Sequence, residues 1–93
     1  MTVVTLRLDL RISPYYSARD NRRQLQAIMD KLHRHFNVSV AGSDGDGGPD
    51  SVVLVAATVA RTRRDAREIL ERVAEAVAAH PRAEILGHAI TEV

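Results

Sequence analysis

Apolar and polar residues alternate along the first part of the chain. Apolar side chains occupy every second position from Val4 to Ile12, and hydroxyl or charged side chains from Thr5 to Arg11 lie between them. Because successive side chains of a strand point to opposite faces, the pattern predicts a half-buried strand with one polar face. Pro14 is expected to end this strand.

After Ser17 the apolar residues recur at steps of three and four, which predicts an amphipathic helix. Asn37 is predicted to stop it, because Asn tolerates the left-handed backbone conformation better than most residues. Val38–Val40 then forms a short second strand. The apolar stripe of the helix consists of Leu25, Ile28, Met29, Leu32 and Phe36.

The second half begins after a segment from Gly42 to Asp50 with four glycines, which predicts a mobile hairpin loop. Ser51–Ala60 is apolar at both its odd-numbered and its even-numbered positions. This is expected of a central strand whose two faces are both largely shielded from water. A second helix starts at Thr62 and is stopped by Pro81. Glu84–Val93 completes the set as a last strand, interrupted by Gly87.

The two predicted helix starts share a motif. Ser17-Ala18-Arg19-Asp20 recurs 45 residues later as Thr62-Arg63-Arg64-Asp65. In each copy the hydroxyl can accept a hydrogen bond from the backbone N–H of the aspartate three residues on. The carboxylate of that aspartate can in turn accept from the backbone N–H of the Ser or Thr, as in a capping box. The chain is therefore expected to consist of two similar halves.

The order strand, helix, strand, strand, helix, strand predicts a ferredoxin-like α+β fold. This is a split βαβ arrangement with a four-stranded antiparallel sheet and two helices on one face, formed by residues 1–93 as a single domain. The open face is expected to carry one parity of the third strand together with part of the last strand. The residues named for it are Val52, Leu54, Ala56 and Thr58 with part of Leu86, His88 and Ile90. Such a mixed patch favours a homodimer or higher oligomer.

Composition excludes several classes of protein. The chain has no cysteine, a formal net charge of +1 and no apolar stretch long enough to span a bilayer. We therefore predict a cytoplasmic protein without membrane contact. No nucleophile, metal or phosphate-loop motif is found, so we expect no cofactor and no metal, and an enzyme is the disfavoured class.

One basic cluster is predicted from the antiparallel packing of the two helices. The end of the first helix would lie beside the start of the second, which would form an anion-binding edge. The alternative is that Asp65, Glu68 and Glu71 neutralise the arginines through helical i,i+4 pairs. The residues brought together would be Lys31, Arg34, Arg61, Arg63, Arg64 and Arg67.

A second basic patch is expected at the opposite end of the molecule, near the Gly-rich loop. Tyrosine beside arginine can stack bases and hold phosphates. Alternatively, the tyrosines pack over the sheet edge and the arginines pair with Asp20, Asp44 or Asp46. The patch consists of Tyr15, Tyr16, Arg19, Arg22 and Arg23.

Four stretches, Leu6–Ile12, Ser17–Arg23, Arg34–Ala41 and His80–Leu86, resemble the YlxP-like family, a small bacterial domain of unknown function. The resemblance runs over nearly the whole chain and implies a ferredoxin-like fold without an established activity. Members are often encoded near ribosome maturation and translation-initiation factors, which implies an RNA- or ribosome-associated role. Asn21, where the family usually has a basic residue, and the acidic loop depart from its pattern.

Three functions follow as hypotheses. The first is a non-catalytic accessory protein that binds RNA or a ribosomal particle through its basic helix ends. The second is a protein–protein or homo-oligomerisation module that uses the open sheet face. The third is the binding of a small anion or metabolite at the start of the second helix.

Overall fold

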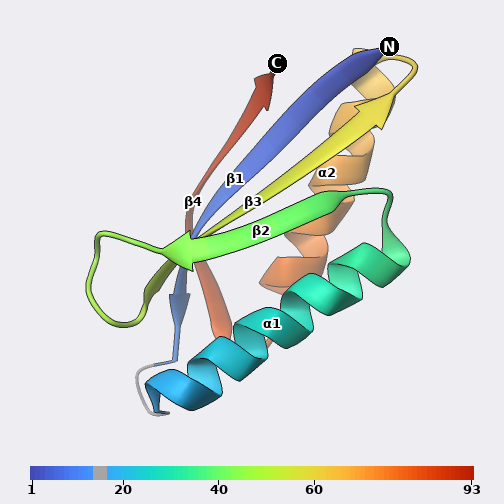
Figure 1. The fold of residues 1–93 in the computed structure, drawn as a ribbon. Coiled ribbons are helices and arrows are strands. Elements are labelled where there is room, and N and C mark those ends of the chain that lie inside the picture. Colours follow the sequence, from blue (N-terminus) through green and yellow to red (C-terminus); the bar gives the residue numbers. More distant parts are fainter. Residues whose placement is uncertain (14–16) are drawn as a thin grey trace.

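The computed structural model describes residues 1–13 and 17–93. The strands pair antiparallel in the order β2-β3-β1-β4. The predicted ferredoxin-like α+β fold is therefore confirmed (Figure 1). The elements are β1 (Thr2–Ile12), α1 (Ala18–His35), β2 (Ser39–Asp44), β3 (Ser51–Ala60), α2 (Arg63–Ala78) and β4 (Ala83–Glu92).

One face of the sheet forms the core with the two helices. Along β1 the alternation is realised as predicted, because Leu6 and Leu8 are fully buried while Arg7 between them is exposed. Burying each such leucine stabilises the fold by about 1.5–3 kcal/mol. The helices contribute Leu25, Ile28 and Leu32 from α1 and Ala66, Leu70, Val73 and Val77 from α2.

The prediction that both faces of β3 are shielded was wrong, and so was most of the prediction for the open face, of which Leu86 is exposed as expected. Leu54 and Ala56 are fully buried under the helices, whereas Val55 and Val59 are 38% and 50% exposed on the other face. His88 lies on the helix side as well, opposite Leu8 of β1. Two helices cover only one face of the sheet, and the register with β1 decides which parity is covered. The uniformly apolar sequence of β3 does not encode that choice.

The hairpin loop is shorter than predicted, because β2 extends to Asp44. Gly42 pairs with Leu54 and Asp44 with Val52, so the connection spans residues 45–50. Gly42 lies under α1, where a Cβ atom would come within 3.2 Å of a Leu25 methyl carbon and 3.3 Å of the Met29 sulfur. This glycine therefore allows α1 to approach the sheet closely. The sequence did not reveal this role, because Gly42 begins a glycine-rich segment that was predicted to be a loop.

At both helix starts the structure forms the hydroxyl half of the predicted capping box. Ser17 Oγ accepts from the backbone N–H of Asp20, and Thr62 Oγ1 accepts from that of Asp65, each at 3.1 Å. The prediction for Asn37 was wrong, since the C-cap of α1 is Phe36 in an extended conformation. The carbonyl of Asn37 instead accepts a 2.6 Å hydrogen bond from Thr58 Oγ1 of β3.

β4 is continuous through Gly87, and the interruption predicted there is a β-bulge at the preceding residue. The register with β1 shifts from Asp9 opposite Gly87 to Leu10 opposite Ile85, so Leu86 is an extra residue in β4. Ile85 packs against the core, and Leu86, its neighbour, is 50% exposed on the open face. The bulge therefore adds a large apolar side chain to the uncovered side of the sheet.

Candidate functional site

The structure does not form the basic cluster that the sequence predicted between the two helices. Lys31 and Arg34 line a cavity of about 390 Å³ together with Ala76, Ala79 and His80, at the C-terminal end of α2. Figure 1 shows this end of α2 next to the middle of α1, with the two helices crossing at a steep angle. The predicted cluster therefore falls into two parts.

The separation follows from how each helix packs on the sheet. Helix α1 lies against β2, whereas α2 lies against β1, β3 and β4, and the two helices contact each other over a short stretch. With a rise of 1.5 Å per residue, Arg64 lies roughly 18 Å along the α2 axis from Ala76. Topology alone predicts which helices are neighbours, but not the angle at which they cross.

His80 marks the place where the end of α2 meets α1. Burial lowers the pKa of its imidazole below the ordinary 6.5, and the cationic Arg82 and Lys31 lower it further. Its Nδ1 accepts a 3.2 Å hydrogen bond from the backbone N–H of Arg82, which requires an unprotonated nitrogen. The neutral imidazole is thus the form that the folded chain favours.

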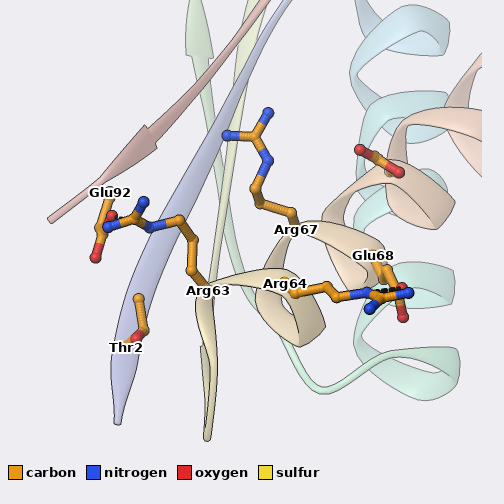
Figure 2. A pocket seen from close by; sticks show the side chains of 7 residues that line it. Thr2, Arg63, Arg64, Arg67, Glu68 and Glu92 are labelled. Carbon is orange, nitrogen blue, oxygen red and sulfur yellow. Dashed lines mark hydrogen bonds and ion pairs between the residues drawn. The ribbon is translucent and has the colours of Figure 1, made fainter.

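At the start of α2 the arginines are engaged by acids (Figure 2). Arg63 Nε lies 2.5 Å from Glu92 Oε2, and Arg64 Nε lies 3.4 Å from Glu68 Oε1. The second pair is the i,i+4 neutralisation that the sequence offered as the alternative to anion binding. The first joins α2 to the end of β4, a contact that only the tertiary structure reveals. Arg61 is exposed in the turn before Thr62.

Arg67 differs from these neighbours. Within residues 1–13 and 17–93 the structure shows no ion pair at its guanidinium. Figure 2 shows its side chain pointing toward the strands, apart from the Arg64–Glu68 pair. Arg67 belongs to the walls of two adjoining cavities, of about 570 and 380 Å³, between α2 and the sheet. Arg67 is thus an arginine of α2 that borders these cavities and remains available to a ligand.

The second predicted patch lies at the start of α1. Tyr15 and Tyr16 are outside the described residues, whereas Arg19, Arg22 and Arg23 are exposed. The predicted proximity to the acidic loop is confirmed for Arg22, which lines a cavity with Asp44, Asp46 and Asp50. The predicted ion pairs to Asp20, Asp44 or Asp46 are not formed in the described part of the chain.

Asn21 has a structural role that sequence reasoning missed. It is 9% exposed, donates from Nδ2 to the carbonyl of Ser13 at 3.1 Å, and accepts from Arg82 Nη2 at 3.0 Å. It thus ties α1 to the residue after β1 and the residue before β4. A polar residue in the first turn of a helix gave no sequence signal for this.

Charge is distributed unequally between the helices. Helix α1 carries five cationic side chains, Arg19, Arg22, Arg23, Lys31 and Arg34, against the two aspartates Asp20 and Asp30. Helix α2 carries four arginines against four acids. Since no ion pair involves α1 within the described residues, its exposed face is the basic surface of the molecule.

Among residues 1–13 and 17–93, none of the helices is long and apolar enough to cross a bilayer. No group of three or more His, Asp or Glu side chains in the described part of the chain is arranged to hold a metal ion.

Comparison with known proteins places the chain among domains without an assigned role. The family model "Protein of unknown function (DUF503)" matches residues 3–90. This agrees with the resemblance to a small domain of unknown function, while the YlxP-like label itself stays a prediction. No curated protein matches the chain by sequence.

Solved structures share the fold at low sequence identity. SnoaB, a cofactor-independent oxygenase from Streptomyces nogalater, superposes with a TM-score of 0.63 at 14% identity, over 98% of this chain and 92% of its own. A dimeric ferredoxin-like protein of unknown function from Thermobifida fusca gives 0.54 at 16% identity, over 100% and 90%. A putative chlorite dismutase, TA0507, gives 0.61 at 18% identity over 99% of this chain. This chain spans only 44% of that protein's length.

These structures overturn the prediction that the protein is not an enzyme. That prediction rested on the lack of a recognisable catalytic motif. SnoaB is an oxygenase that needs no cofactor and is built on the same fold. In this fold the lack of a motif in the sequence is therefore not evidence against catalysis, although the likeness itself shows the fold alone.

Proposed function

Since this chain belongs to the DUF503 family of proteins of unknown function, its role has to be derived from its own surfaces, and we propose that it works as a homodimer. The two copies meet through the open face of the sheet. The observation that carries this proposal is the set of large apolar side chains left exposed on that face.

These side chains are spread over three strands. Val3 of β1, Val55 and Val59 of β3, and Leu86 of β4 are 38–50% exposed. The register places Val3 beside Val59, so they form a continuous pair rather than isolated residues. Val55 lies opposite Arg7, so apolar and charged side chains alternate across this face. Exposed large apolar side chains on one face are typical of a protein interface.

The charges on the open face suit a second copy of the same chain. Arg7 Nη2 and Asp9 Oδ1 are 3.1 Å apart in the central strand β1, and Arg11 lies opposite Glu84 of β4. A twofold interface brings the same patch of both copies together. Alternating cations and acids along β1 allow each copy to place its arginine against the partner's carboxylate.

The size of the face is sufficient for a stable contact. The two longer extents of the molecule are 42 and 25 Å. A broad face of this outline offers on the order of 1,000 Å², whereas a standard interface buries about 800 Å² per partner. The dimeric ferredoxin-like protein from Thermobifida fusca supports the proposal as a dimer built on the same fold.

The experiment is the replacement of Val55 by Glu, followed by light scattering coupled to size exclusion. We expect the native chain to have the mass of a dimer and V55E the mass of a monomer, because a buried carboxylate without a partner is strongly unfavourable. The matched control is Ala18→Glu, which adds the same charge on the helix side. A native chain that stays monomeric up to millimolar concentration refutes the dimer.

A second function, favoured by the charge of α1, is the binding of RNA phosphates. The exposed cations of α1 are free of ion pairs within the described residues and lie on the side of the sheet opposite to the proposed interface. A dimer would therefore present two such helices outward. Arg63 and Arg64, which the sequence favoured, support this function less because acids already engage them. As part of this proposal, the protein binds RNA in the cytoplasm.

The RNA function is tested by titrating a structured RNA at several salt concentrations. Each phosphate contact releases counterions, so the affinity should fall steeply with salt. Arg19→Gln/Arg23→Gln should weaken binding by roughly tenfold and reduce the salt slope by about two. Arg64→Gln/Arg72→Gln on α2 removes the same charge and should have little effect. Equal losses in both double variants, or no binding at low salt, would exclude α1 as an RNA surface.

A further inference from the structure

A groove runs between α2 and β4 on the helix side of the sheet. Its floor is apolar and consists of Leu6 and Leu8 of β1 with Ile85 and Ile90 of β4. The residues of β1 on this side are fully buried, but those of β4 are only half-buried, so α2 leaves β4 incompletely covered. The groove has a volume of about 380 Å³, within the range of small-molecule sites.

Charged side chains border the groove. Arg67, Glu71 and Glu75 follow one another at four-residue steps on one face of α2, and His88 of β4 lies across from them. Arg67 and Glu71 also line the adjoining cavity at the start of α2, so both cavities border the same two side chains.

The cation and the first acid of this row do not neutralise each other. In the described part of the chain neither Arg67 nor Glu71 takes part in an ion pair. An arginine four residues before a glutamate is the weaker of the two helical orders, because the opposite order matches the helix dipole. One positive and one negative group are thus held side by side, both open to a ligand, above an apolar floor.

From this arrangement we infer that the groove binds a small zwitterion with an apolar body, for which an aliphatic amino acid is the simplest example. The guanidinium of Arg67 takes the carboxylate through paired hydrogen bonds, and the carboxylate of Glu71 takes the ammonium group. The aliphatic side chain lies on the floor between Ile85 and Ile90. Glu71 and Glu75 together disfavour a nucleotide or another polyanion, because their charge opposes phosphate.

The test uses the full chain labelled with ¹⁵N and titrated with L-leucine, observed by NMR. We expect the amide signals of residues 67–75 and 85–90 to shift. Two probes each lack one charge: 4-methylpentanoate has no ammonium group, and 3-methylbutylamine has no carboxylate. Each should bind at least about tenfold more weakly than leucine, since each loses one charge-assisted contact.

Variants distinguish a specific groove from a general charge effect. Arg67→Gln should weaken leucine binding by about tenfold or more, whereas Arg72→Gln, exposed on the same helix and outside the groove, should not. Glu71→Gln should reduce the binding of leucine and of the amine but not that of the acid. Dispersed spectra establish that each variant is folded.

Three outcomes overturn the inference. They are no shift in these segments up to roughly 10 mM leucine, equal affinity for 4-methylpentanoate and leucine, and equal effects of R67Q and R72Q. The groove lies on the other side of the sheet from the proposed dimer interface, so a monomeric chain would leave this result unaffected.

Discussion

Single polar side chains hold the packing elements of this protein in place. Asn21 links α1 to the end of β1 at Ser13 and to the start of β4 at Arg82, and the Thr58 hydroxyl links β3 to Asn37 after α1. His80 lies where α2 ends against α1 and accepts from the backbone of Arg82. These contacts join segments that are distant in the sequence, which is why no local pattern announced them.

The lowered pKa of His80 makes the stability of the fold depend on pH. Above the unfolded value of 6.5 both states carry a neutral imidazole, and the contribution of His80 is fully present. As the pH falls from 6.5 toward the lower pKa of the folded state, the unfolded chain binds the proton first, so the free energy of unfolding decreases. His80→Asn should reduce this decrease.

Urea unfolding at about pH 7.5 and pH 5.5 measures the effect. Asn keeps an acceptor near the Arg82 amide but does not titrate. His33→Asn, on an exposed part of α1, serves as the control and should retain the pH difference of the native chain. A difference that is unchanged in H80N would show that another group is responsible.

Within the elements, the repeated motif acts at the first turn of each helix. Its Ser or Thr residue is the N-cap, and the hydroxyl oxygen accepts a hydrogen bond from the backbone N–H of the aspartate three residues on. The arginines of the motif have no common role, because Arg64 pairs with Glu68 while Arg19 forms no ion pair among the described residues. The repetition therefore reflects two similar helix starts rather than two similar binding sites.

Removing either cap should destabilise the fold to a similar degree. Ser17→Ala and Thr62→Ala should each lower the free energy of unfolding by about 1 kcal/mol, because one backbone N–H loses its acceptor. Ser17→Asp, which still accepts, should stay close to the native chain. Chemical denaturation measures all three, and Ser39→Ala on the exposed side of β2 is a control for loss of a hydroxyl. Equal midpoints for S17A and S17D would argue against capping.

At the scale of the whole molecule, the sheet separates two different surfaces. The helix side carries the basic α1 and the groove beside α2, while the open side carries Val3, Val55, Val59 and Leu86. Assembly through the open side would leave both surfaces of the helix side accessible. Self-association and ligand binding are therefore compatible in the same molecule.

Dimer formation should also appear in the thermal stability. Because association stabilises the folded state by mass action, the native Tm should rise with protein concentration. V55E should have a Tm that is independent of concentration, whereas A18E should follow the native chain. Calorimetry over a hundredfold range of concentration compares the three. A native Tm that does not change over this range would contradict the dimer.

The sequence by itself determined the element order, the helix starts, the polarity of β1 and hence the fold. These depend on side-chain periods and on capping residues that act within a few positions of each other. The arginines of the repeated motif also lie within a few positions of their acids. The pairing of Arg64 with Glu68 is a local i,i+4 contact, so the sequence was enough to propose it.

The tertiary structure alone decided which groups meet. The register between β1 and β3 placed Leu54 in the core and Val55 outside, although the two are equally apolar. The crossing of α1 and α2 moved Lys31 away from the start of α2, and the end of β4 brought Glu92 to Arg63. Such contacts depend on packing angles and strand register, which arise from many side chains at once and leave no mark at any single position.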